Sequence, residues 1–167
     1  RLDRISSLDP EVWFADFRLP VAGAMPRVSS GGMPFAPYTE QLPNTCKDYF
    51  AIDGWVQYET ADGTWIWTSR DAPLITFGEH NVLARRTNAP HDTHRVLAML
   101  YNNVWYTNFL ASTEGMLEYQ FDLAWSAKPV PPSGVEAFAD ALTIEPLVHI
   151  NPAVPDEPLY LERLFKP

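Results

Sequence analysis

The sequence predicts an all-β fold: an antiparallel β-sandwich with one long loop rich in proline and glycine and one short helix. Three observations predict it. Apolar and polar residues alternate with a period of two in several separate stretches. Turn-forming residues separate these stretches. Only one short segment carries the signals of a helix start.

The alternation is clearest in residues 116–125, MLEYQFDLAW, and in residues 12–19, VWFADFRL. It recurs in residues 48–58 and 64–70. This period is typical of a strand with one buried and one solvated face. Residues 96–101, VLAMLY, are apolar throughout and predict a central strand. The predicted buried residues are Trp13, Ala15, Phe17, Leu19, Phe50, Ile52, Val56, Tyr58, Trp65, Trp67, Leu117, Tyr119, Phe121, Leu123 and Trp125.

The connections between these stretches hold much of the proline. Residues 23–45 contain four prolines and three glycines, which predicts a long irregular loop. Residues 61–63, Ala-Asp-Gly, are typical of a hairpin turn. The predicted helix begins with Ser133 as its N-cap, has Glu136 three residues on as the second member of a capping box, and continues to Leu142.

Composition bounds the class of protein. A length of 167 residues fits one domain, residues 1–167, and 46% hydrophobic with 20% charged residues is a globular composition. A net charge of −9 without a basic cluster argues against nucleic acid as a partner. No apolar run is long enough to predict a membrane span. The single cysteine, Cys46, excludes an intrachain disulfide and leaves the compartment open, with the cytoplasm favoured.

Residues 91–94, HDTH, place two imidazoles beside a carboxylate, with His80 eleven residues earlier. Such a set could bind a metal if another ligand joined it. The alternative is a solvated turn that leads into the strand at residues 96–101, and the turn chemistry of the segment favours it. No spacing singles out a pair of carboxylates, and Cys46 has no activating base beside it. The sequence therefore predicts no metal ligand and no catalytic residue.

Residues 102–109, NNVWYTNF, place three asparagines, a threonine and three aromatic rings directly after the apolar strand. Aromatic faces flanked by side-chain amides suit sugars, which stack on rings and exchange hydrogen bonds with amides. The alternative is that the amides close Asx turns and satisfy backbone groups in a tight loop. Both interpretations remain open from these residues alone.

Four stretches, in this order, resemble the C-terminal β region of α-mannosidase-like glycoside hydrolases of family 38. They are PEVWFADFRLP (residues 10–20), EQLPNTCKDYFAIDGWVQY (40–58), WTSRDAPLITFGE (67–79) and NNVWYTNFLASTEGMLEYQFDL (102–123). The similarity extends over roughly residues 9–150. Two departures are Asp16, where the family has an aromatic-proline strand end, and Asn44-Thr45, where it has Gly-Ser.

The resemblance implies where the chemistry lies. In that family the catalytic zinc, its ligands and the nucleophilic aspartate belong mainly to an N-terminal α/β barrel opened by a His-x-Asp motif. No stretch of this chain matches that motif, so no catalytic or metal residue is transferred to it and no cofactor is expected in it. The zinc is expected in the absent catalytic domain.

The resemblance further implies that the chain is the C-terminal fragment of a larger hydrolase, a sandwich that packs on the catalytic barrel and helps to form the sugar cleft. The alternative is a free-standing carbohydrate-binding module. An accessory domain should expose a broad apolar patch, whereas a sugar-binding module should expose a polar surface with one aromatic shelf. The residues predicted for the domain junction or the carbohydrate rim are Asn103, Trp105, Thr107, Asn108, Gln41 and Asp48.

Overall fold

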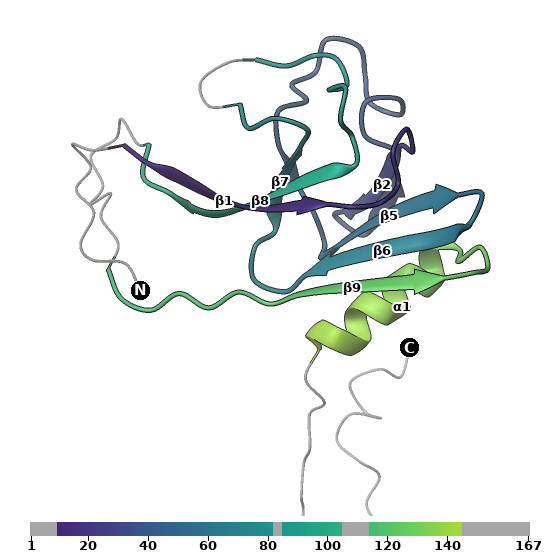
Figure 1. Cartoon of the computed structure of the whole chain (residues 1–167). Coiled ribbons are helices and arrows are strands. Elements are labelled where there is room, and N and C mark those ends of the chain that lie inside the picture. Colours follow the sequence, from purple (N-terminus) through teal and green to yellow (C-terminus); the bar gives the residue numbers. More distant parts are fainter. Residues whose placement is uncertain (1–9, 82–84, 105–113, 145–167) are drawn as a thin grey trace, which may run out of the picture.

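The computed structural model describes residues 10–81, 85–104 and 114–144, which form two antiparallel sheets and one helix (Figure 1). The predicted β-sandwich is confirmed. One sheet has four strands, in the order β1 (Val12–Arg18), β8 (Arg95–Asn102), β7 (Leu74–Phe77) and β4 (Phe50–Ala51). The other has five, in the order β3 (Met33–Phe35), β2 (Pro26–Ser30), β5 (Trp55–Thr60), β6 (Gly63–Ser69) and β9 (Phe121–Ser126). The helix α1 is Pro132–Thr143.

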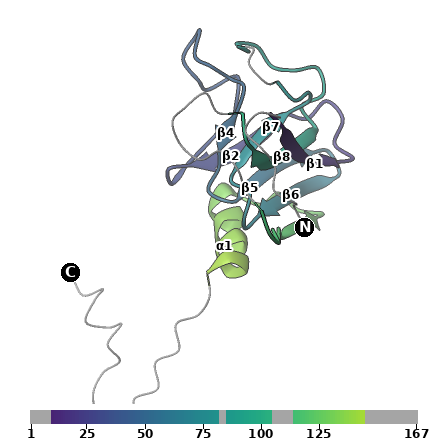
Figure 2. The same cartoon turned by 90° about the vertical axis from the view of Figure 1, so that its left-hand side faces the viewer.

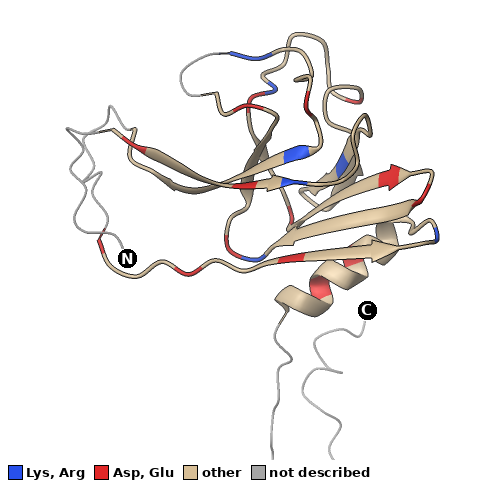
Figure 3. Cartoon of the chain, in the orientation of Figure 1, with Lys and Arg blue, Asp and Glu red and all other residues tan. Residues whose placement is uncertain are grey.

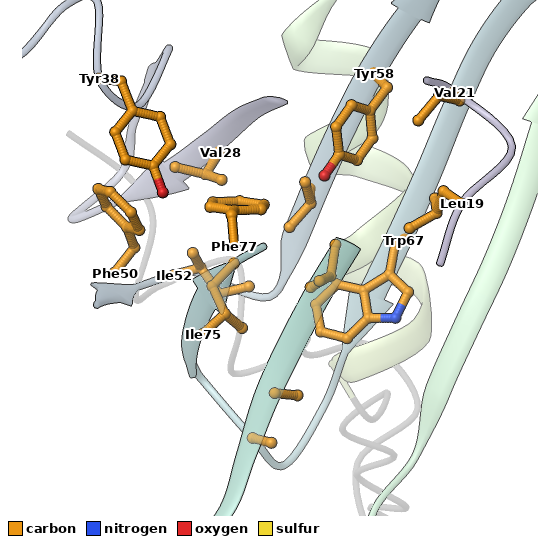
Figure 4. Close-up of a cluster of buried hydrophobic side chains, with 14 residues drawn as sticks. Leu19, Val21, Val28, Tyr38, Phe50, Ile52, Tyr58, Trp67, Ile75 and Phe77 are labelled. Carbon is orange, nitrogen blue, oxygen red and sulfur yellow. The ribbon is translucent and has the colours of Figure 1, made fainter. Parts of the chain in front are cut away.

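The core lies between the two sheets (Figure 4). Alternate residues of β5, β6, β7 and β8 point into it, as a period of two requires. Among them Trp67, Tyr58 and Phe77 are at most 1% exposed. At one side of the core the ring of Phe121 on β9 lies 4.8 Å from that of Phe17 on β1, measured between centroids, and thus joins the edges of the two sheets.

The helix α1 covers the outer face of the five-stranded sheet, on the side away from the four-stranded sheet (Figures 1 and 2). Its Val135 and Ala139 pack against Trp55 of β5 and Ile66 of β6 in a second apolar cluster. Strand β5 is therefore buried on both faces, since Val56 and Tyr58 point into the first core. Among the described residues, no helix is long and apolar enough to cross a membrane.

The start of the helix differs from the prediction. The N-cap is Pro131, which makes no side-chain capping bond, and Pro132 is the first helical residue. Proline suits that position because its missing N–H would have no partner there. Ser133 lies inside the first turn, and Glu136 accepts a hydrogen bond from the Trp55 indole instead of a helix-start amide. The predicted capping box is therefore wrong, although the helix exists.

Two predicted segments are divided differently in the structure. Residues 48–58 form not one strand but β4 and β5, which belong to different sheets, because the chain turns at Asp53 and Gly54. Residues 23–45, predicted to be irregular, contain the β2–β3 hairpin. Gly31 and Gly32 adopt positive φ angles of 61° and 75° in its turn, a conformation that glycine reaches without steric cost.

The carboxylate of Asp53 fastens that hairpin turn. It accepts hydrogen bonds from the N–H groups of Gly31 (3.1 Å) and Gly32 (2.7 Å) and from the hydroxyl of Ser29 (2.9 Å). These bonds, the Gly32 amide first, hold the pKa of Asp53 below its ordinary value of 3.8. The residue at which the chain passes between the sheets thus also orders a neighbouring turn.

Candidate functional site

Asn102 and Asn103, at the end of β8, are engaged within the sandwich. Asn103 is 2% exposed; its backbone N–H donates to the Glu11 carbonyl at 3.1 Å, and its Oδ1 accepts from the Glu11 N–H. This side chain thereby prolongs the pairing of β8 with β1. The Oδ1 of Asn102 accepts from the Val104 N–H at 2.8 Å, which closes an Asx turn. For these two residues the geometry agrees with the turn interpretation.

The other residues predicted from the same stretch are Trp105, Thr107 and Asn108. They lie outside the described residues, which end at residue 104 on this side and begin again at residue 114. Their assignment to a junction or rim stays a prediction.

Asp48, another of the residues predicted for the junction or rim, connects two loops. It is 6% exposed, and its Oδ1 accepts from Asn81 Nδ2 at 2.5 Å and from the Arg86 N–H at 2.6 Å. Its Oδ2 accepts from the thiol of Cys46 at 2.8 Å. The backbone N–H of Lys47 also donates to the Arg86 carbonyl, at 2.8 Å. The carboxylate thus clamps the loop before β4 to the loop after β7.

Gln41 orders the same loop from within. Its Oε1 accepts from the N–H of Tyr38 at 3.0 Å, and the Lys47 ammonium donates to the Tyr38 carbonyl at 3.2 Å. Tyr38 has a φ of 73°, which is uncommon for a residue with a side chain, so these two bonds hold an unfavourable backbone conformation. The Tyr38 ring points into the core (Figure 4), where burial raises its pKa to about 12.

The structure brings Gln41 and Asp48 together but not Asn103 with them. Strands β7 and β8 are antiparallel with Phe77 opposite Val96, near the start of β8. Arg86 donates to the Phe77 carbonyl at 2.9 Å, so the Asp48 clamp lies at this end of the four-stranded sheet. Asn103 follows the opposite end of β8. The described members of the predicted set therefore do not converge on one site.

The HDTH segment forms a turn. His91, whose side chain is fully exposed, lies 2.8 Å from Asp92, and this contact lowers the pKa of that carboxyl. The hydroxyl of Thr93 donates to the Ala24 carbonyl at 2.9 Å, and its own carbonyl accepts from the Tyr58 hydroxyl at 2.7 Å. In residues 10–81, 85–104 and 114–144 there is no group of three or more residues able to hold a metal ion.

A shallow open depression lies on the outer face of the five-stranded sheet. It has a volume of about 280 Å³ and is bordered by Met25, Arg27, Gln57 and Glu59, among others. Gln57, 1% exposed, donates from its amide to the Val130 carbonyl at 2.7 Å, and so holds the segment that leads into α1. The depression thus borders a structural contact.

One apolar surface feature was not predicted. It consists of Trp65, Leu123 and Trp125, which we call the β9 strip. Leu123 is 57% and Trp125 53% exposed, although both follow the alternation of Phe121, which packs in the core. The rings of Trp65 and Trp125 lie 6.4 Å apart between centroids. The face of the sheet that forms the core is therefore exposed to solvent in the later part of β9.

The prediction of core positions is wrong for four residues, which are Leu117 (38% exposed), Leu123 (57%), Trp125 (53%) and, on β1, Trp13 (51%). Alternation identifies the face of a strand on which a side chain lies. It does not report how far the opposite sheet extends over that face. The four-stranded sheet covers Phe121 through Phe17 but leaves the later part of β9 uncovered.

The chain matches no protein-family model, no curated protein and no solved structure. A function is therefore inferred from its own residues and geometry.

Proposed function

We propose that this chain is the accessory C-terminal β-sandwich of an α-mannosidase-like glycoside hydrolase, which packs on the catalytic barrel and helps to form the sugar cleft. The observation that carries the proposal is the β9 strip. Two large apolar side chains, Leu123 and Trp125, are more than half exposed on the face that elsewhere forms the core. Neighbouring apolar side chains exposed on one face suit a contact with another protein surface.

The strip can contribute measurable docking energy. Fully burying a large apolar side chain contributes about 1.5–3 kcal/mol. Leu123 and Trp125 are roughly half buried already, so covering the remainder adds on the order of 1 kcal/mol for each. Trp65, which packs against the core beside Trp125, gives the strip a rigid base. A partner that covers all three residues would bind to an apolar surface that is already formed in the isolated chain.

A departure from the family pattern also supports the proposal. Asn44 stands where the family has glycine, and it adopts a φ of 62°, in the left-handed region. Glycine enters this region without cost, and asparagine is one of the few other residues that visit it routinely. The replacement therefore keeps the backbone conformation that a glycine at this position would supply. It lies in the same loop as Gln41 and Asp48, whose hydrogen bonds hold that loop on the sandwich.

In this proposal the zinc and the catalytic residues belong to the barrel, and the present chain supplies stability and part of the cleft wall. The reading frame that precedes Arg1 tests the assignment. We expect it to encode, without a stop, an α/β barrel with a His-x-Asp motif. A frame that encodes no such barrel would contradict the proposal.

A second candidate, a carbohydrate-binding module, is favoured by the Trp65–Trp125 pair, because an exposed indole face beside a second ring can stack on a sugar. Titration of the purified chain with mannose oligosaccharides separates the two candidates. Saturable binding that Trp125→Ala abolishes would favour the module. The matched control is Trp13→Ala, which removes an equally exposed indole outside the strip.

A further inference from the structure

We propose that a second copy of this chain pairs with strand β9, edge to edge and antiparallel, so that two five-stranded sheets join across a two-fold axis. Strand β9 ends its sheet: it pairs with β6 from Phe121 to Ser126, and no described strand lies on its other side. Such an edge presents backbone N–H and C=O groups that another strand can pair with.

The other three edges of the sandwich carry the features that normally prevent such pairing. Strand β3 has three residues and contains Pro34, and β4 has only two residues. Strand β1 has an irregular register between Trp13 and Phe14 and carries two charged side chains. Short length, proline, bulges and charge are the known protections of an edge.

Strand β9 lacks the first three of these protections. Its six residues, FDLAWS, contain no proline, glycine, lysine or arginine, and its register with β6 is regular throughout. The one charged residue of β9, Asp122, lies 3.3 Å from the guanidinium of Arg70, which offsets its charge. Figure 3 shows acidic but no basic colour along β9. Of the described edges, β9 is thus the one open to a further strand.

The sequence of β9 is complementary to itself. Residues directly opposite one another in an antiparallel pair project on the same face of the sheet. We place the two-fold axis at Leu123, so that Leu123 of one copy lies directly opposite Leu123 of the second copy, on the same face of the joined sheet. Phe121 then lies opposite Trp125 of the second copy, which gives an aromatic pair on the apolar face. Asp122 lies opposite Ala124, so no like charges meet directly.

The charge of the whole chain opposes this association at long range. Each copy has a net charge of −9, and repulsion between two copies is screened beyond about 8 Å at physiological ionic strength. We therefore expect association to strengthen as salt is added. Edge pairing leaves the side chains of the β9 strip on the sheet face, so it is compatible with the proposed function and does not rest on it.

Analytical ultracentrifugation of the full chain over a range of concentrations tests the inference. We expect a reversible equilibrium between monomer and dimer. Leu123→Lys and Leu123→Asp each place like charges opposite one another at the two-fold axis, and each should raise the dimer dissociation constant about tenfold or more. An equimolar mixture of the two variants should recover the dimer, because Lys then faces Asp. The matched control, Leu117→Lys, alters an exposed leucine that precedes β9 and should leave the equilibrium unchanged.

Four outcomes would overturn the inference. The wild-type chain could stay monomeric up to its solubility limit at high salt. It could form open-ended aggregates, which a two-fold contact excludes. Both Leu123 variants could dimerise as the wild type does, or their mixture could stay monomeric. Far-ultraviolet circular dichroism and urea unfolding of each variant verify that the sandwich is intact, and Leu123 is exposed enough for both substitutions to be tolerated.

Discussion

The indole N–H of Trp55, on β5, donates a 2.6 Å hydrogen bond to the carboxylate of Glu136, on α1. Trp55 is completely buried, so this bond satisfies a donor that water cannot reach. It also fixes the rotation of the helix on the sheet. The helix is therefore held by one directional, charge-assisted contact in addition to its apolar face.

Glu136→Ala should lower the free energy of unfolding by about 1–3 kcal/mol, because it leaves the Trp55 indole buried without an acceptor. The control is Asp140→Ala, which removes an exposed carboxylate from the same helix and should change stability by no more than about 0.5 kcal/mol. Urea unfolding followed by tryptophan fluorescence measures both. Equal losses in the two variants would show that the bond adds nothing.

Loss of the whole Asp48 carboxylate should destabilise the protein more than its replacement by the amide of asparagine. Asp48→Ala removes one acceptor from the Arg86 N–H and one from the Asn81 amide, so we expect the free energy of unfolding to fall by about 2 kcal/mol or more. Asp48→Asn keeps one oxygen for both donors and should lose less. Amide hydrogen exchange at Arg86 provides the local readout: it should accelerate in the alanine variant and much less in the asparagine variant. Unchanged exchange in both would contradict the clamp.

The pKa of Asp53 predicts part of the acid unfolding. Its folded pKa lies below 3.8 because the Gly32 and Gly31 amides and the Ser29 hydroxyl bind the carboxylate. Its stabilising contribution is therefore complete above about pH 4 and is lost as the pH falls through the folded pKa. Asp53→Asn should be less stable than wild type at neutral pH, and the difference should shrink in acid. A difference independent of pH would show that the charge is not involved.

Two buried tyrosines predict how the stability of the fold declines at alkaline pH. Burial raises the pKa of Tyr58 well above 10.0 and that of Tyr38 to about 12. The pKa values of both tyrosines are higher in the folded than in the unfolded chain. Their contribution to the free energy of unfolding is therefore complete below about pH 10 and is lost as the pH rises above it. Tyr58→Phe should make the decline of the unfolding free energy with pH shallower. Urea unfolding at several alkaline pH values measures the slope, and an unchanged slope would contradict the assignment.

Much of the sandwich could be predicted from the sequence because burial of one strand face leaves a pattern of period two. The inward positions of Phe50, Ile52, Val56 and Tyr58 were predicted and are buried. Phe50 lies on β4 and Ile52 just after it, whereas Val56 and Tyr58 lie on β5 of the other sheet. The division at Asp53 leaves no trace in that pattern, since the chain passes from one sheet to the other without changing which face is apolar.

The candidate site was less predictable for a related reason. Polar residues such as Asn103 and Asp48 stand out in the sequence, yet in the structure they satisfy backbone and side-chain groups of the chain itself. The residues of the β9 strip do not stand out in the sequence, because the alternation places Leu123 and Trp125 among the predicted core residues. Only the limited extent of the opposite sheet exposes them, and extent is a property of tertiary structure that local alternation does not encode.

The effect of Trp125→Lys on the unfolding midpoint, compared between the isolated chain and the chain joined to the proposed catalytic barrel, tests the proposed docking role most directly. Trp125 is half exposed in the isolated chain, so the substitution should cost about 1 kcal/mol there. In the joined protein it buries an ammonium in an apolar junction, which should cost several kcal/mol more. Met33→Lys, at an exposed residue of β3, should behave alike in both. An equal cost of Trp125→Lys in the two proteins would contradict the docking role.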